Sequence, residues 1–464
     1  MKATRLSVLI AVFTTASFSL NAAEIHIPRD YPTIQSAISH AEDGDVVVAD
    51  PGRYEENLDF LGKSIVVRSV NPADPETVEA TVIDGCQKGP VIIMRGVASG
   101  TIQGLKIVNG LAEYASGGGI LCDNSTASIV GNVIVGNKAS SRGGGLLCLD
   151  SDIMICANLI SSNEACRGGG IGLQGSVAQV MENVLSENNG GAIGGWYSSG
   201  TISDNAMISN DAVAPRGALA IDYRRWVVCG NVIRGNSGGG IWVAPNSMIV
   251  GNNMILDNTG AFTGGIHVRS GSLIISNNLI IGNSSIFCAG LSHSGSDIAT
   301  ISGNAVVGNS SGWTGGLEAE GPVYLVGNSF YGNRSAGVYG PQAKFTRNSQ
   351  SWVQNCVFFG KGSLLTIGDS MFDSTIVTLS HSLVCLGKVH AIPASNLIVG
   401  PGNIDAIDAD PLFVDPGHWD DAGTTFDYSD DTFVLGDYHL LPGSPCIDAG
   451  TNDVDNPDTP EIET

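Results

Sequence analysis

The residues best suited to chemistry lie between positions 242 and 320. Glu318 and Glu320 are separated by one residue in a segment predicted to be a strand, so their side chains should point the same way, about 7 Å apart. This spacing lies within the range of the paired carboxylates that hydrolyse glycosides. His267 and Arg269 have the same spacing two repeats earlier, and Arg269 could replace the lysine base of a polysaccharide lyase. These four residues are the candidate catalytic residues.

Aromatic side chains accompany these candidates. Phe262, Phe287 and Trp313 occupy equivalent positions in three successive repeats, four residues after an asparagine. Rings at this spacing either stack on one another or offer a flat platform for sugar rings. Together with Trp242 and His267 they are the candidate substrate-binding residues. The sequence leaves both interpretations open, beside the plainer one that this surface is only solvated.

A repeated phrase, Asn-x-x-x-x-Asn, sets the positions of all these residues. Nine intact copies run from Asn132 to Asn333, and their starts are 22 to 26 residues apart. A fixed period in this range is the signature of a solenoid, in which each repeat packs only against its neighbours. The phrase encloses β-branched runs, and a group of glycines followed by an apolar residue marks a second strand. The pattern therefore predicts an all-β fold, a parallel β-helix.

Stacked coils convert sequence positions into columns, with about 4.8 Å between coils. Equivalent asparagines should stack amide on amide and satisfy polar groups at a buried turn. The apolar residue after the glycines should point inward and the next residue outward. The predicted outward column consists of Leu121, Leu147, Gly172, Ile193, Leu219, Trp242, His267, Ser292, Glu318 and Tyr339. A Ser–His–acid relay is not expected, because Ser292 and not His267 would be its middle member.

Composition and charge limit the cellular compartments and the classes of partner that the protein can have. The chain has 464 residues, of which 62 are glycine, and its net charge is -23, which argues against nucleic acid as a partner. A basic start followed by an apolar run predicts a signal peptide over residues 1–23. No other apolar run is long enough to form a transmembrane segment. We therefore expect a monomer that is secreted, extracellular or periplasmic and that binds a polysaccharide or cell-surface glycan.

Cysteines and a cluster of acids raise two further questions. Cys122 and Cys148 occupy the same position in adjacent coils, so their Cα atoms should lie about 5 Å apart, within reach of a disulfide. Two small buried thiols are the alternative. No cofactor is indicated with certainty, and Ca²⁺ is the only candidate. Its oxygen ligands would come from Asp453, Asp455 and Asp458, although the segment lacks the glycine and glutamate of an EF-hand and acidic tails are usually only solvated.

Two segments resemble known proteins. The opening, Asp30-Tyr-Pro-Thr-Ile-Gln-Ser-Ala-Ile and then Gly44-Asp-Val-Val-Val-Ala-Asp-Pro-Gly-Arg-Tyr-Glu-Glu-Asn57, resembles that of right-handed parallel β-helix proteins, including pectinesterases and many exported bacterial proteins. Near the end, Ala409-Asp-Pro-Leu-Phe-Val-Asp-Pro416 together with Asp437-Tyr-His-Leu-Leu-Pro-Gly-Ser-Pro-Cys-Ile-Asp-Ala-Gly450 resembles the closing segment of large bacterial β-helix surface and secreted proteins. The resemblance implies a right-handed solenoid with an N-terminal helical cap and an irregular acidic C-terminal cap. The catalytic motifs of pectinesterases and polygalacturonases are absent from the sequence.

The predicted organisation has four parts: a signal peptide (1–23), an N-terminal cap with the first strands (24–64), β-helix coils (65–400) and an acidic segment (401–464) expected to cover the top of the stack. Two functional classes follow. The missing catalytic motifs favour a module that binds polysaccharide or acts as an adhesin-like structural protein. The alternative is a carbohydrate-active enzyme, a polysaccharide lyase or glycoside hydrolase, that uses the outer face near residues 242–320.

Overall fold

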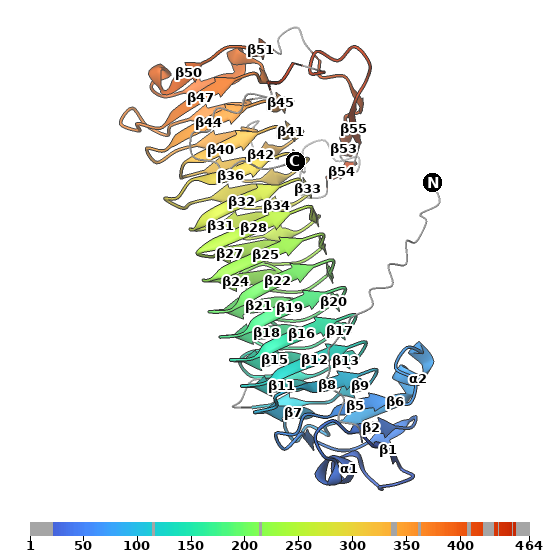
Figure 1. Ribbon diagram of the computed structural model, residues 1–464. Coiled ribbons are helices and arrows are strands. Elements are labelled where there is room, and N and C mark those ends of the chain that lie inside the picture. The colour runs from blue at the N-terminus through green and yellow to red at the C-terminus, as the bar shows by residue number, and fades with distance from the viewer. Residues whose placement is uncertain are drawn as a thin grey trace.

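The chain forms a long solenoid of stacked parallel strands (Figure 1). The computed structural model describes residues 22–113, 117–212, 216–335, 341–360, 363–405, 410–420, 431–434, 436–447 and 449–451. Within these residues three parallel sheets run along the solenoid: sheet A with 16 strands, sheet B with 15 and sheet C with 14. The predicted all-β parallel β-helix is therefore confirmed. No helix in the described part of the chain is long and apolar enough to cross a membrane.

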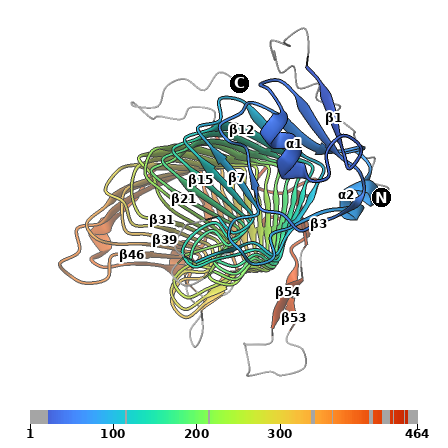
Figure 2. The same ribbon diagram turned by 90° about the horizontal axis from the view of Figure 1, so that it is seen from below.

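Each regular coil visits the three sheets in a fixed order. In one such coil β11 (Ile120–Asp123) belongs to sheet C, β12 (Thr126–Val130) to sheet A and β13 (Val133–Val135) to sheet B. A corner that contains β14 (Lys138–Ala139) and the glycines then leads to the next strand of sheet C, β15 (Leu146–Leu149). Successive coils pair in register, and the view along the solenoid shows their strands superposed (Figure 2).

Sheet C and the corner beside it hold the candidate residues. The other strands of sheet C are β4 (Leu58–Asp59), β7 (Ile92–Arg95), β18 (Ile171–Gln174), β21 (Ile193–Trp196), β24 (Leu219–Asp222), β27 (Ile241–Ala244), β31 (Ile266–Val268), β35 (Leu291–His293), β39 (Leu317–Ala319), β43 (Ala343–Phe345), β46 (Leu365–Ile367) and β49 (Val389–Ala391). The corner forms short strands of its own, which are β10 (Leu111–Ala112), β30 (Thr259–Gly260), β34 (Ser284–Ser285), β38 (Ser310–Ser311) and β42 (Arg334–Ser335).

Sheets A and B complete the coils. The other strands of sheet A are β1 (Glu24–Ile27), β2 (Val46–Ala49), β5 (Val66–Ser69), β8 (Gly100–Gln103), β16 (Asp152–Cys156), β19 (Val177–Met181), β22 (Ser199–Ser203), β25 (Arg225–Cys229), β28 (Ser247–Gly251), β32 (Ser272–Ser276), β36 (Ala299–Ser302), β40 (Val323–Val326), β44 (Gln350–Gln354), β47 (Ile376–Ser380) and β50 (Leu397–Val399). The other strands of sheet B are β3 (Gly52–Tyr54), β6 (Thr81–Asp84), β9 (Lys106–Val108), β17 (Leu159–Ser161), β20 (Val184–Ser186), β23 (Ala206–Ile208), β26 (Val232–Arg234), β29 (Met254–Leu256), β33 (Leu279–Ile281), β37 (Ala305–Val307), β41 (Ser329–Tyr331), β45 (Val357–Phe359), β48 (Leu383–Val384) and β51 (Ile404–Asp405).

The two asparagines of each phrase flank a strand of sheet B and form two buried ladders, as predicted. The Asn132 backbone N–H donates to Asn158 Oδ1 (2.9 Å), and Asn132 Nδ2 donates to the same oxygen (3.0 Å) and to the Ile102 carbonyl (3.0 Å). One ladder ends where Asn333 Nδ2 donates to Gln342 Oε1 (2.8 Å). The amides thus pair backbone groups that water does not reach.

The core fills the space between the three sheets. The middle residue of each regular sheet B strand points inward and is buried, giving the column Ile134, Ile160, Leu185, Met207, Ile233, Ile255, Ile280, Val306, Phe330 and Phe358. Each such side chain contributes about 1.5–3 kcal/mol by leaving water. Each coil packs mainly on the coils next to it. The core is therefore continuous only where the strands of successive coils keep the same register.

A short helix lies at the N-terminal end of the solenoid (Figure 1). In α1 (Ile34–His40), Thr33 Oγ1 caps the first turn by accepting a hydrogen bond from the Ser36 backbone N–H (3.1 Å). Ile34, Ala37 and Ile38 are buried against the first coil. A second helix, α2 (Pro75–Ala80), lies beside β6, and two 3₁₀ turns, η1 (Leu386–Lys388) and η2 (Ala394–Asn396), lie in the last coils.

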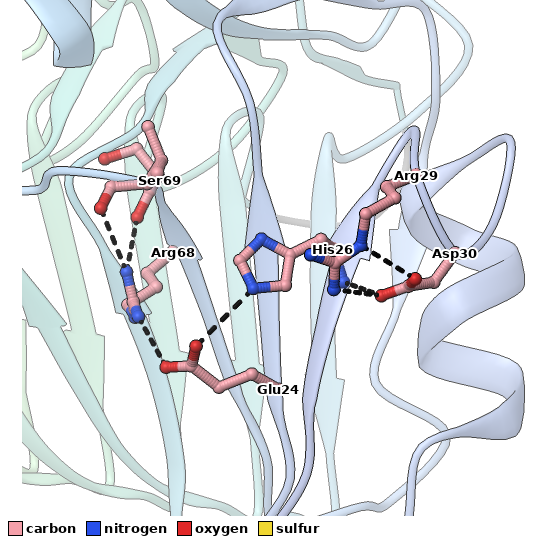
Figure 3. A network of polar contacts seen from close by, with 7 residues as sticks. Glu24, His26, Arg29, Asp30, Arg68 and Ser69 are labelled. Carbon is pink, nitrogen blue, oxygen red and sulfur yellow. Dashed lines mark hydrogen bonds and ion pairs between the residues drawn. The ribbon is translucent and has the colours of Figure 1, made fainter.

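Polar contacts hold the first strand of sheet A in place (Figure 3). Arg68 Nη2 on β5 pairs with Glu24 Oε1 on β1 (2.9 Å), across the intervening strand β2. The His26 backbone N–H donates to Asp30 Oδ2 (2.8 Å), and Arg29 pairs with the same carboxylate (3.0 Å). These contacts fix both ends of the edge strand.

Residues 404–405 form β51, the last strand of sheet B, whereas β52 to β55 lie beside sheet B instead of covering the last coil, which differs from the expected position (Figure 1). These four strands form two antiparallel pairs, β52 (Phe413–Asp415) with β55 (Asp437–Leu440) and β53 (His418–Asp420) with β54 (Thr432–Val434). Trp419 Nε1 donates to the Gly332 carbonyl (2.8 Å). The Phe433 ring lies so close to Gly308 that a side chain there would clash. An aromatic contact with sheet B therefore holds this segment.

Candidate functional site

The predicted outward column of sheet C exists from Trp242 to Glu318. Trp242, His267, Ser292 and Glu318 are consecutive Cα partners, and Lys344 follows them. The order also confirms that the serine lies between the histidine and the glutamate. Tyr339, which was assigned to the same column, lies outside the described residues.

Two earlier members of that column were assigned wrongly. Ile193 pairs with Ile171 and Leu219 pairs with Ile193, so both point into the core. The outward residues of these coils are Gly194 and Ala220. The prediction was wrong by one residue in these two repeats, because an alanine (Ala192 or Ala218) replaces the last glycine of the group that precedes the sheet C strand.

The corner carries the three predicted aromatic residues on its solvent side. The Phe262 and Phe287 ring centroids are 5.3 Å apart and nearly parallel, and Trp313 meets Phe287 edge-on at 5.5 Å. Their exposed fractions are 49%, 36% and 60%. The next residues, Thr263, Cys288 and Thr314, are paired from coil to coil and buried. The rings therefore stack and remain open to solvent, so the two interpretations of this column are compatible.

The corner and the sheet C column are in contact. Thr263 Oγ1 lies 3.3 Å from His267 Nδ1, and the Trp242 and His267 rings are 6.3 Å apart on neighbouring strands. At the far end Lys344 Nζ lies 5.8 Å from the Trp313 ring. The aromatic corner and the polar column therefore form one surface.

Both candidate glutamates are neutralised by cations of the next coil. Glu318 Oε1 lies 3.2 Å from Lys344 Nζ, and Glu320 Oε1 lies 3.0 Å from Arg347 Nη2. Burial raises the pKa of Glu320, while Arg347 opposes this shift and Glu318 adds to it. Glu318 lies on β39, whereas Glu320 follows the end of that strand, so the two do not share a strand as predicted. Each has a cationic partner that the sequence did not indicate.

The histidine and the nearest cysteine are poorly suited to acid–base or nucleophilic work at neutral pH. Burial lowers the pKa of His267 to about 4, with smaller contributions from Arg269 and His293. Burial raises the pKa of the Cys288 thiol well above its usual value, and Glu318 adds to the effect. His267 is therefore an uncharged hydrogen-bonding group, and Cys288 stays protonated. Arg269, one coil above Trp242, is exposed.

Sequence reasoning missed a group of arginines lower on the same sheet. Arg142 and Arg167 lie 5.0 Å and 5.5 Å from the Trp196 ring, and Arg142 also donates to Gln174 Oε1. Arg216 is close enough that both arginines, after burial, lower its pKa. The sequence did contain a pattern that could have indicated this group, because each of these arginines directly precedes the glycines of its repeat. The direction of a corner side chain cannot be read from that position alone.

The remaining candidates concern cysteines and metal ligands. Cys122 and Cys148 are Cα partners on β11 and β15, both buried and both free thiols, and a hydrogen bond with Cys122 raises the pKa of Cys148. Their disulfide stays a prediction. Asp453, Asp455 and Asp458 lie outside the described residues. Within the described ranges no group of three or more His, Cys, Asp or Glu side chains is placed to hold a metal ion.

The comparison with known families agrees with this architecture. Residues 118–280 match the family model described as a right handed beta helix region. No curated protein matches the chain. Together with the three parallel sheets, the match defines the fold class as a right-handed parallel β-helix solenoid. It covers the coils that hold the arginines and those up to β33, and it carries no statement about activity.

Proposed function

We propose that this chain is an exported protein that binds a polysaccharide along the outer face of sheet C. The observation that carries the proposal is the exposed stack of Phe262, Phe287 and Trp313 in contact with the polar column of sheet C. Large aromatic rings left open to water on successive coils present flat apolar surface, which suits the apolar faces of sugar rings. Hydroxyl groups of the sugar would find a hydrogen-bonding partner in His267, which is partly exposed, whereas Ser292 is buried.

Binding is favoured over turnover by the state of the titratable groups. His267 is neutral at physiological pH, and Glu318 is held by Lys344. A general acid or base works best with a pKa near the working pH and with a free path to the substrate. The side chains of this face are instead arranged as fixed donors, acceptors and rings. The proposal therefore includes an adhesin-like or structural role that depends on binding alone.

A glycoside hydrolase or lyase is the second candidate, and one observation favours it. Glu320 has a raised pKa beside a second carboxylate, which is the pattern of a general acid in paired-carboxylate hydrolysis. In that case Glu318→Gln or Arg269→Ala would abolish product formation without unfolding the chain. Reducing-sugar and unsaturated-product assays on acidic polysaccharides test this candidate directly.

The binding proposal is tested with a glycan array followed by titration calorimetry on the best ligand. Trp313→Ala and Phe262→Ala should each weaken binding about tenfold or more, because buried aromatic contacts dominate such interfaces. Trp352→Ala is the matched control, since Trp352 stacks on Tyr324 at 4.5 Å on the outer face of sheet A. Equal losses in the control and in the corner variants, or no glycan bound by the wild type, would overturn the proposal.

Export is part of the proposal and rests on the predicted signal peptide. The Ala23 carbonyl already accepts a hydrogen bond from the Val46 backbone N–H (2.9 Å), so the ordered sheet begins next to the predicted cleavage site. Cell fractionation with N-terminal mass determination of the exported form tests it. An uncleaved chain confined to the cytosol would contradict export.

A further inference from the structure

Three arginines gather on the outer side of sheet C in a protein with a net charge of -23. Arg142 and Arg167 are bridge partners on neighbouring corners, and Arg216 lies two coils beyond Arg167, three residues before its strand of sheet C. In the described part of the chain none of the three has a carboxylate within ion-pair distance. By contrast, Arg53, Arg95, Arg234 and Arg347 each pair with an acidic side chain.

Trp196 holds the first two guanidinium groups in place. The indole lies over Gly194, where an added Cβ would come within 2.6 Å of the ring, so only glycine lets the ring lie against the sheet. Arg142 and Arg167 cover the ring, which is left 7% exposed. A guanidinium stacked on an indole keeps its N–H donors free at its edge. Arg142 uses one donor on Gln174 Oε1. The stacking therefore preorganises two cations and leaves the remaining donors of Arg142 and those of Arg167 for a ligand.

The neighbouring carboxylate does not neutralise this group. Asp222 is the Cα partner of Trp196 on the next strand, and its Oδ1 is buried without a hydrogen bond to any described residue. Burial raises the pKa of Asp222, although Arg216, Arg167 and Arg269 oppose the shift. Three arginines against one carboxylate leave a local excess of positive charge.

The arginine group is continuous with the proposed binding surface. Trp196, Asp222 and Ala244 are consecutive Cα partners, and Trp242 lies on the same strand as Ala244. Trp196 thus lies two coils, or about 10 Å, before the first member of the polar column. A chain that follows sheet C would pass from the arginines to Trp242 without leaving the sheet.

We propose that Arg142, Arg167 and Arg216, supported by Trp196, form a subsite for the carboxylate or sulfate groups of an acidic polysaccharide. This inference rests on the proposed function and specifies the class of ligand. Guanidinium groups bind carboxylate and sulfate oxygens through paired N–H donors, and such charge-assisted bonds are about twice as strong as neutral ones. The net negative charge of the protein repels a polyanion elsewhere, so the arginine group favours its binding at this subsite.

The test compares three probes: polygalacturonate, dextran sulfate and uncharged dextran. The wild type should bind an anionic probe at least tenfold more tightly than dextran, and added salt should reduce the difference. Arg167→Gln and Arg216→Gln should each lose about tenfold in affinity for the anionic probe, which corresponds to about 1.4 kcal/mol. The two anionic probes separate carboxylate from sulfate recognition.

Two matched variants keep the result interpretable. Arg234→Gln removes the same charge from sheet B, where Arg234 pairs with Asp257, and should leave affinity unchanged. Arg167→Lys keeps the charge but loses the planar fork, so it should recover only part of the affinity. Unchanged thermal unfolding of each variant shows that the coil is intact.

The outcomes separate this inference from the proposed function. Equal binding of dextran and polygalacturonate, lost in Trp313→Ala but unchanged in Arg167→Gln and Arg216→Gln, overturns the arginine subsite and leaves the binding function standing. Equal losses in Arg234→Gln also overturn the subsite, because they would reflect total charge only. Failure of the wild type to bind either anionic probe overturns the subsite, and failure to bind any glycan of the array overturns the proposed function as well.

Discussion

Burial of the Asp222 carboxylate has an energetic cost. This carboxylate lies between Trp196 and Ala244 on sheet C, with one oxygen buried and unpaired among the described residues. Its pKa lies above the ordinary value of 3.8, chiefly because of burial. The folded state therefore binds the proton more tightly than the unfolded state does. The ionised form costs stability at neutral pH, and this cost disappears below the ordinary pKa.

We predict that Asp222→Asn stabilises the protein at pH 7 by up to about 1 kcal/mol and has little effect at pH 3. Because the shift is upward, the gain should grow as the pH rises from the ordinary pKa through the folded-state pKa and then stay constant. Urea unfolding followed by circular dichroism at several pH values measures this. Asp257→Asn is the control, since removing a carboxylate paired with Arg234 should not stabilise. A stabilisation of Asp222→Asn that is independent of pH would contradict the assignment.

At this scale the sequence predicted positions better than partners. Trp242, His267 and Glu318 were placed in one column because their spacing from the glycine mark is fixed. Lys344 and Arg347 were not predicted as partners of the glutamates, because they follow Asn333, where the regular repeat ends. The arginines around Trp196 were missed because their side chains reach across coils, and periodicity does not give the direction of a long side chain.

The asparagine ladder is the element that keeps the coils in register. Asn258 Oδ1 accepts from the Asn236 backbone N–H (3.0 Å) and from Asn236 Nδ2 (2.9 Å), and Asn258 Nδ2 donates to the Ile233 carbonyl (2.9 Å). All these groups are buried between two corners. The ladder therefore joins strands that would otherwise leave polar groups unpaired at the edge of the core.

We predict that Asn258→Ala destabilises the protein by about 3 kcal/mol, because several buried donors and acceptors lose their partner at once. Denaturant unfolding monitored by circular dichroism measures the change. Asn246→Ala is the matched control, since Asn246 is exposed in the turn after β27 and its side chain makes no hydrogen bond with another described residue. A loss of unfolding free energy no larger than that of Asn246→Ala would show that the asparagine ladder is a consequence of the strand register and does not stabilise it.

At the scale of elements, the repeat predicted most of the architecture. The asparagine phrase became sheet B, and the strand after the glycines became sheet C, because both patterns recur at every coil. The sequence did not predict the strands of sheet A as separate elements, because the alternation of apolar residues continues from sheet C through the turn into sheet A. Among the described members of the predicted column, the register was wrong only at Ile193 and Leu219, where alanine replaces a glycine that the pattern required.

The whole molecule is a one-dimensional stack with an accessory segment on one side. Coils contact mainly their neighbours, so a local change should stay local. The segment with β52 to β55 contacts sheet B around Tyr331, whose ring meets Phe413 at 5.9 Å. Arg334 pairs with Asp431 and lies 3.5 Å from the Trp419 ring. Together with the indole hydrogen bond to Gly332, these contacts attach a segment far along the chain to coils that precede it.

We predict that Trp419→Ala releases this segment without unfolding the coils. Loss of the indole removes the hydrogen bond to Gly332 and the stacking partner of Arg334, so residues 413–420 and 431–434 should exchange amide hydrogens faster, together with β41. Strands β13 to β20 should keep their protection, because they lie several coils away. Hydrogen–deuterium exchange read by mass spectrometry distinguishes the regions, and Trp242→Ala on sheet C serves as the control. Faster exchange throughout the solenoid would mean that the segment stabilises the entire stack, whereas unchanged exchange at β41 would mean that Trp419 does not anchor it.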